Sequence, residues 1–165
     1  MRTVTARTTI DDLDDFLADI ETISEATDTA IQCFDADYVA GERHLRRAVE
    51  LAERARKQGT AVARDPAVEI LLYAAGRRQI NQALEMGVSE GDSDVVGVVT
   101  GGDEAAAEQR LRERLDAAPA DNPVSLGDEE TIKAFFEIGD AEAAVVNENL
   151  EAVVLERVAL LDVEK

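Results

Sequence analysis

The sequence has few of the residues on which most catalytic and metal sites depend. It contains one histidine, one cysteine and no tryptophan in 165 residues. Its four serines lie outside any nucleophile-elbow context. A zinc site of the usual type needs more cysteine and histidine than this chain has, and the chain contains no Walker loop or kinase motif. We therefore expect a binding protein with no catalytic residue, no metal and no cofactor.

Cys33 is the only cysteine, so an internal disulfide is impossible and a reducing compartment is expected. We expect this thiol to be a small buried apolar side chain. Apolar runs of the roughly 18 residues needed to cross a bilayer are missing, as is the apolar core of a signal peptide at the N-terminus. These features predict a soluble cytoplasmic protein without a membrane partner.

Positive charge is scarce as well. The chain has 36 acidic and 17 basic residues, which gives a net charge of −19, and only three of the basic residues are lysines. Regular apolar periodicity argues against disorder as the explanation. A dense carboxylate surface keeps a folded protein hydrated in a salt-rich cytoplasm, so we infer a halophilic, archaeal source. Under this interpretation the overall acidity says nothing about the partner.

The distribution of charge is more informative than its total. The segment from Arg43 to Arg78 holds nine basic and four acidic residues, a net charge of +5. The rest of the chain holds eight basic and 32 acidic residues, a net charge of −24. This asymmetry predicts an anionic partner for one segment of an otherwise acidic protein.

The clearest helix runs from Gly41 to Lys57. At 100° per residue its leucine, valine and alanine side chains share one face. Five cations share the opposite face, with Glu50 as the one acid among them: Arg43, Arg46, Arg47, Arg54 and Lys57. In a protein covered in carboxylates, such a face favours a binding role over a merely solvated surface.

The segment Glu69–Leu84 (EILLYAAGRRQINQAL) predicts a helix, a glycine and a second helix. Asp65-Pro66 is a typical start for the first helix, with aspartate as the N-cap and proline in the first turn. Gly76 suits the left-handed C′ position at its end. Arg77 and Arg78 follow immediately, so two guanidinium groups are expected at the bend.

The remaining pattern predicts an α+β fold. We expect a small, largely antiparallel sheet of a few strands and about seven helices in a single domain over residues 1–165. The expected strands are an edge strand Arg2–Arg7, Ala30–Phe34 and a central Val95–Thr100. The other expected elements are a helix from Ile10 capped by Thr9, a helix Asp103–Ala117, a turn Pro119–Pro123, a helix capped by Asp128 and ending at Phe136, a short helix capped by Asp140, and Leu150–Leu161.

Three stretches resemble the kinase-binding, TPRKB-like regulatory subunit of the KEOPS complex. They are VAGERHLRRAVELAERARKQG (Val39–Gly59), EILLYAAGRRQINQAL (Glu69–Leu84) and VLERVALLDV (Val154–Val163), in that order. The most specific piece is LLYAAGRRQI, in which Gly76, Arg78, Gln79 and Ile80 carry more weight than Arg77. Together the three stretches span most of the chain.

The resemblance implies a non-catalytic subunit of an assembly that makes threonylcarbamoyladenosine in tRNA. Such a subunit docks directly on the small atypical kinase/ATPase subunit and meets the other KEOPS subunits only indirectly. In archaea it also grips the 3′ CCA tail of tRNA. Guanidinium groups can hydrogen-bond phosphates and stack on unpaired bases, which fits the cationic face and the arginines at the bend.

On this basis we assign candidate residues to two surfaces. The candidate RNA-binding residues are Arg77, Arg78, Gln79, His44, Arg43, Arg46 and Arg47. The candidate kinase-binding residues are Ile80, Leu84, Leu155, Val158 and Leu161. His44 lies between the two faces of its helix, so a structural role competes with a ligand contact. Two other functions stay open: a small acid–base or Mg²⁺-dependent enzyme, and a protein-only adaptor whose basic face meets an acidic partner.

Overall fold

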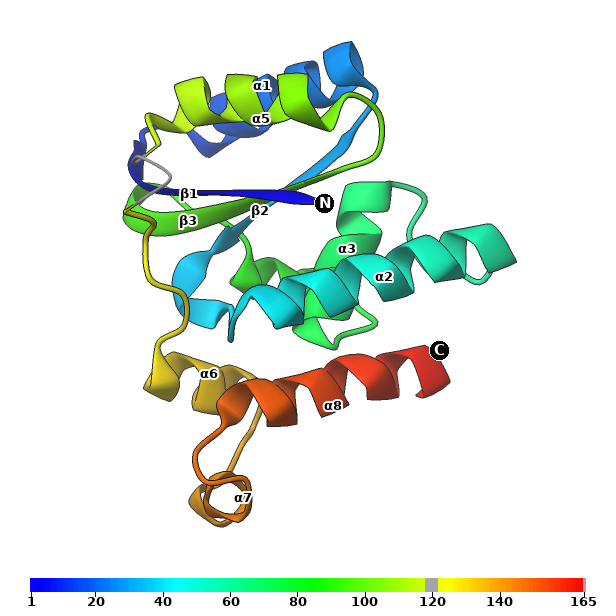
Figure 1. Ribbon diagram of the computed structural model, residues 1–165, viewed down its shortest axis with the longest axis vertical. Coiled ribbons are helices and arrows are strands. Elements are labelled where there is room, and N and C mark those ends of the chain that lie inside the picture. Colours follow the sequence, from blue (N-terminus) through cyan, green and yellow to red (C-terminus); the bar gives the residue numbers. More distant parts are fainter. Residues whose placement is uncertain (118–121, 165) are drawn as a thin grey trace. The chain divides into compact units, whose positions relative to one another are not determined.

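The computed structural model describes residues 1–117 and 122–164. These residues form a three-stranded antiparallel sheet and eight α-helices, which confirms the predicted α+β class (Figure 1). The chain divides into two compact units. The first, which we call the sheet unit, comprises residues 1–36 and 87–125, and the second, the helical unit, comprises residues 37–86 and 126–165.

The sheet contains β1 (Arg2–Ile10), β2 (Ala30–Asp35) and β3 (Gly91–Thr100). The strand order is β1-β3-β2, and both pairs are antiparallel. The prediction of a central third strand is confirmed, because β3 pairs on both sides. Its four valines, Val95, Val96, Val98 and Val99, are fully buried, as expected for a strand apolar on both faces.

Two strands are longer than their apolar pattern indicates. β3 begins at Gly91, four residues before the predicted Val95, because its polar start pairs with the polar end of β1: Thr8 lies opposite Ser93 and Thr9 opposite Asp92. The predicted helix start at Ile10 with Thr9 as its cap is therefore wrong. The first helix, α1, runs from Leu13 to Thr27, and the Asp12 side chain caps it.

One face of the sheet is covered by α1 and α5 (Glu104–Leu115), as Figure 1 shows. Gly97 of β3 allows α5 to approach closely, because an added Cβ would lie 2.7 Å from a methyl carbon of Leu111. Cys33 is 4% exposed in this core. The prediction of a buried thiol is confirmed, and burial raises its pKa to about 12, as expected for a thiol that is not used as a nucleophile.

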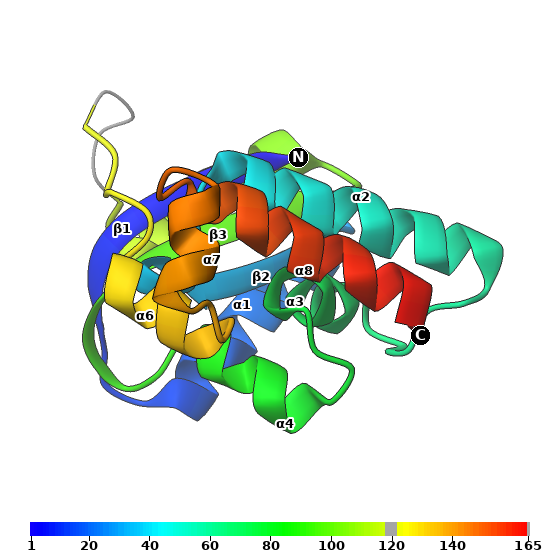
Figure 2. The ribbon, with the colours of Figure 1, turned by 90° about the horizontal axis from the view of Figure 1, so that it is seen from below.

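In the helical unit, α2 (Glu42–Gln58), α3 (Pro66–Ala75) and α8 (Leu150–Glu164) pack against one another (Figure 2). α3 starts as predicted, with Pro66 in its first turn and the Asp65 side chain accepting from the Ala67 N–H. The side chains from Ile70 to Ala75 are all buried. A helix that is apolar all round is thus enclosed by its neighbours.

Shorter elements complete the chain. They are α4 (Ile80–Ala83), α6 (Glu129–Phe135), α7 (Asp140–Val145), and the 3₁₀ turns η1 (Ala36–Tyr38) and η2 (Leu84–Met86). Asp128 caps α6 as predicted, accepting from the Thr131 N–H at 3.1 Å. The predicted capping by Asp140 is wrong, because Gly139 is the N-cap and Asp140 is the first residue of α7. Residues 119–121 of the predicted turn lie outside the described residues.

Candidate functional site

The bend after α3 is built on Gly76, as the sequence predicts. Gly76 has φ of +63°, the left-handed conformation of a helix C-cap. The N–H of Arg77 donates to the Leu72 carbonyl at 3.1 Å and closes the cap. A Cβ at Gly76 would lie 3.3 Å from the Arg157 carbonyl oxygen of α8. Glycine is thus favoured here by backbone conformation and by close packing.

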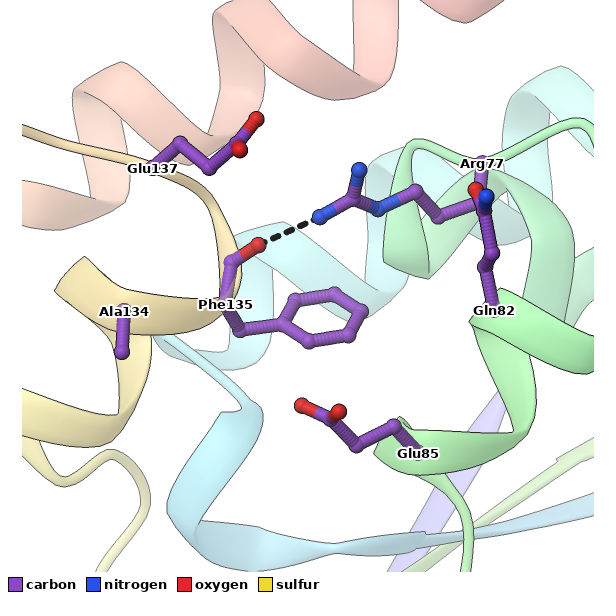
Figure 3. Close-up of a pocket in the computed structure, with 6 residues that line it drawn as sticks. All are labelled: Arg77, Gln82, Glu85, Ala134, Phe135 and Glu137. Carbon is purple, nitrogen blue, oxygen red and sulfur yellow. Dashed lines mark hydrogen bonds between the residues drawn. The ribbon is translucent and has the colours of Figure 1, made fainter.

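The two arginines at the bend have different environments. Arg77 is half-buried: its guanidinium donates to the Phe135 carbonyl at 2.5 Å, and its Cζ lies 5.0 Å from the centre of the Phe135 ring (Figure 3). Arg78 and Gln79 are exposed. Within the described part of the chain their side chains make no hydrogen bond or ion pair. Arg78 and Gln79 are therefore available to a ligand, whereas Arg77 is held by the protein.

A cleft of about 250 Å³ lies beside Arg77. Phe135 and Arg77 form one part of its lining, and Gln82, Glu85 and Glu137 contribute polar groups (Figure 3). The cleft offers hydrogen-bond acceptors and the Phe135 ring, which the Arg77 guanidinium already covers. Its two carboxylates make it a poor site for a phosphate.

The cationic face of α2 borders a second cleft of about 300 Å³, lined by Arg43, Arg46, Arg47, Glu50 and Leu155. Two of its arginines pair within the helix: Arg46 with Glu42 at 2.8 Å and Arg47 with Glu50 at 3.2 Å. Surface pairs of this kind contribute at most about 1 kcal/mol each, so a phosphate can replace them. Arg43 is exposed and has no carboxylate within 4 Å among the described residues.

His44 lies inside the helical unit and is fully buried. Its Nδ1 accepts from the Ala40 N–H at 3.0 Å, which leaves Nε2–H to donate to the Ala74 carbonyl at 2.7 Å. Burial lowers the pKa of the imidazole to about 4. Both ring nitrogens are used within the protein, so this position does not fit the predicted RNA contact and agrees with the structural role.

The candidate kinase-binding residues separate into two groups. Val158 and Leu161 are 0% and 4% exposed, because they form the face of α8 that packs into the helical unit. Their assignment to a docking surface is therefore corrected. Ile80 and Leu84 are 46% and 58% exposed, and Leu155 is partly exposed at the α2 cleft. These three side chains remain available to a partner.

Sequence reasoning missed the polar side chains that connect α8 to α2, α3 and α7. Asp162 of α8 accepts from the Tyr73 hydroxyl of α3 at 2.7 Å and from the Arg54 guanidinium of α2 at 2.6 Å. Arg157 of α8 forms a bidentate pair with Glu142, at 2.8 and 3.1 Å. A tyrosine within an apolar helix is a signal that its hydroxyl needs a partner, but the sequence does not show which of many acids provides it.

Neither a metal-binding cluster nor a membrane-spanning helix is found among the described residues. In the described part of the chain, no group of three or more histidine, cysteine, aspartate or glutamate side chains is placed so that it could hold a metal ion. None of the described helices combines the length and apolarity needed to cross a membrane.

Comparison with known proteins agrees with the resemblance seen in the sequence. A search of curated proteins found no match. The family model described as "Kinase binding protein CGI-121" matches residues 9–162. The match covers both units and includes the α2 face, the bend at Gly76 and α8. The chain therefore belongs to the CGI-121 family of kinase-binding, TPRKB-like proteins.

Proposed function

We propose that this protein is a non-catalytic cytoplasmic subunit of the KEOPS complex that docks on the kinase/ATPase subunit and recruits tRNA by its 3′ CCA tail. Membership of a kinase-binding family supports the docking role. The RNA role rests on one observation: exposed arginines on α2 and at the bend, in a chain with a net charge of −19. On this proposal the transfer reaction and the contacts with further KEOPS subunits belong to its partners.

The exposed arginines suit a single-stranded RNA end. The exposed Arg43 and Arg46 and the partly exposed Arg47 line the α2 cleft together with the apolar side chain of Leu155. Guanidinium groups bind phosphates with two parallel hydrogen bonds and stack on unpaired bases. The unstacked bases of a single-stranded tail present both their faces and their edges. Arg78 and Gln79 would add contacts at the bend.

Apolar side chains next to the bend suit the kinase subunit. Ile80 and Leu84 lie four residues apart at the start of α4 and of η2, and both are about half exposed. Exposed apolar side chains of this size are typical of the centre of a protein interface. On this proposal the kinase packs on Ile80 and Leu84 while Arg78 and Gln79, immediately before them, face the RNA.

If the source is halophilic, its high salt concentration determines which interactions contribute to RNA affinity. At molar salt the Debye length is about 3 Å, so long-range attraction is screened. Affinity from counterion release is then small. Binding would depend on bidentate hydrogen bonds and stacking, which act at contact distance. The arginine-rich, lysine-poor composition of α2 fits this requirement, because arginine makes both kinds of contact.

The test is a pull-down of the tagged protein from its native cytoplasm. The proposal predicts that a kinase subunit and tRNA co-purify with it. If the kinase is recovered without tRNA, and nuclease treatment does not release the kinase, the protein-only adaptor is favoured. Recovery of neither would contradict the proposal.

A further inference from the structure

Backbone hydrogen bonds hold both ends of the segment from Arg77 to Gln79: the Arg77 N–H donates to the Leu72 carbonyl, and the Gln79 carbonyl accepts from the N–H groups of Gln82 and Ala83. Gly76 ends α3, and α4 starts at Ile80. Gln79 occupies the N-cap position of α4 but its side chain makes no capping hydrogen bond. Arg78 has no side-chain partner among the described residues. The side-chain contact that fixes this segment is therefore the one between Arg77 and Phe135.

Phe135, to which Arg77 is attached, is buried and packed among aromatic rings. It is 6% exposed, and its ring meets Tyr38 and Phe136 edge-on at centroid distances of 5.4 and 4.9 Å. Its carbonyl lies at the C-terminal end of α6, where the helix dipole favours a cation. Arg77 uses both features, because its guanidinium bonds the carbonyl and lies over the ring (Figure 3).

We propose that Arg77 is a positioning residue for tRNA binding: its clamp on Phe135 holds the segment so that Arg78 and Gln79 face the RNA, and Arg77 itself makes no RNA contact. This inference rests on the proposed function. Without the clamp, only the backbone hydrogen bonds at its two ends would hold the segment, and the side chains of Arg78 and Gln79 would have to be ordered further when RNA binds. Ordering a flexible side chain or loop residue weakens binding by a factor of about two to ten.

The salt dependence of tRNA binding separates this role from the two alternatives. Arg77→Ala is expected to weaken binding about threefold to tenfold at every salt concentration, with an unchanged slope of log affinity against log salt. Loss of a direct phosphate contact would instead reduce the slope by about 0.7 for single-stranded RNA, as we expect for Arg78→Ala. A purely structural residue, assayed well below the melting temperature, would leave the affinity unchanged. Either of the last two results for Arg77→Ala would overturn the proposal.

Arg114 provides a matched control in the sheet unit. Its Cζ also lies 5.0 Å from a phenylalanine ring, that of Phe16, and it pairs with Asp19 at 2.8 Å. Arg77→Ala and Arg114→Ala should both lower the melting temperature, because each removes a guanidinium group that is hydrogen-bonded and lies over a ring. Arg114→Ala should leave the tRNA affinity unchanged. Arg77→Lys keeps a donor for the Phe135 carbonyl without the planar stacking group. It should recover part of the affinity with the wild-type salt slope, and it serves as the test variant if Arg77→Ala does not fold.

The failure of this inference differs from the failure of the proposed function. If the wild-type protein binds tRNA equally with and without its CCA end, the proposed tRNA contact is wrong. If Arg78→Ala weakens tail-dependent binding and Arg77→Ala does not, only the positioning role is wrong.

Discussion

The Tyr73 hydroxyl donates a 2.7 Å hydrogen bond to Asp162, 89 residues later in the chain. The second oxygen of the same carboxylate accepts from Arg54 at 2.6 Å. One carboxylate of α8 thereby connects α3 and α2. Burial and the hydrogen bond to Asp162 both raise the pKa of Tyr73, so the phenol stays protonated and acts as the donor.

Removal of the Tyr73 hydroxyl tests how much its hydrogen bond to Asp162 of α8 contributes to the free energy of unfolding. Tyr73→Phe is expected to lower the free energy of unfolding by about 2 kcal/mol, because a partly buried hydrogen bond to a charged acceptor is lost. The exposed Arg54–Asp162 pair is worth less than about 1 kcal/mol, so Arg54→Gln should have a smaller effect. Urea unfolding followed by circular dichroism measures both. Equal stability of the Tyr73→Phe variant and the wild type would contradict the assignment.

The buried His44 predicts a pH dependence of stability. Its pKa is lowered from 6.5 to about 4 in the folded protein, so below pH 6.5 the unfolded chain binds a proton that the folded protein does not. The stabilisation is complete above pH 6.5 and is lost as the pH falls toward 4. Between pH 7.5 and 5 the expected loss from this group is about 2 kcal/mol.

The variant His44→Gln isolates this contribution. The carboxylates of the chain titrate in the variant and in the wild type alike, so only the imidazole distinguishes their pH profiles. Urea unfolding at both pH values should show a larger decrease for the wild type. Parallel pH profiles would mean that His44 is accessible to protons in the folded state, contrary to its complete burial.

The α2 cleft predicts the effect of removing two arginines. The double variant Arg43→Ala/Arg46→Ala should weaken tRNA binding about tenfold and reduce the salt slope by about 1.4, for two lost phosphate contacts on a single strand. Both side chains are exposed, so the melting temperature should change little. Filter binding over a range of salt concentrations provides both numbers.

Arg110 is the control for this pair. It is exposed on α5 of the sheet unit, outside both clefts. Arg110→Ala removes one positive charge and should leave affinity and slope unchanged. A loss of affinity in Arg110→Ala as well as in the double variant would indicate a general effect of charge and would contradict a specific α2 site.

The exposed apolar pair predicts a variant that separates docking from RNA binding. Leu84→Asp places a charge on a side chain that is 58% exposed, so folding should be preserved. Desolvating that carboxylate in an apolar interface is unfavourable, and co-elution with the kinase subunit should be lost. Leu17→Asp, at a position 48% exposed in the sheet unit, should leave co-elution intact. Normal co-elution of the Leu84→Asp variant would contradict docking at Leu84.

Sequence periodicity and capping residues were sufficient for most of the fold. The apolar run of β3, the caps at Asp65 and Asp128 and the left-handed Gly76 are local signals, and all of them are confirmed. Periodicity does not predict the polar residues 91–94 as strand, because their pairing partners lie in β1, more than 80 residues earlier. Pairing at that separation leaves no local pattern.

The site was harder to predict for the same reason. Arg77 and Arg78 are identical neighbours in the sequence, and only Phe135, 58 residues after Arg77, distinguishes their roles. α8 carries apolar residues on more than one side, so its pattern could not show that Val158 and Leu161 face the core while Leu160 and Val163 remain exposed. Which side of such a helix is buried depends on α2 and α3.

The most direct test of the central claim is filter binding of tRNA with and without its 3′ CCA end, using the wild-type protein and Arg78→Ala. If exposed arginines grip the tail, removal of the CCA end weakens wild-type binding about tenfold or more, since each stacked base contributes about 1–3 kcal/mol. The Arg78→Ala variant should bind the intact tRNA more weakly, at an unchanged melting temperature, and lose part of its dependence on the tail. Equal wild-type affinity for the two tRNAs would contradict the account.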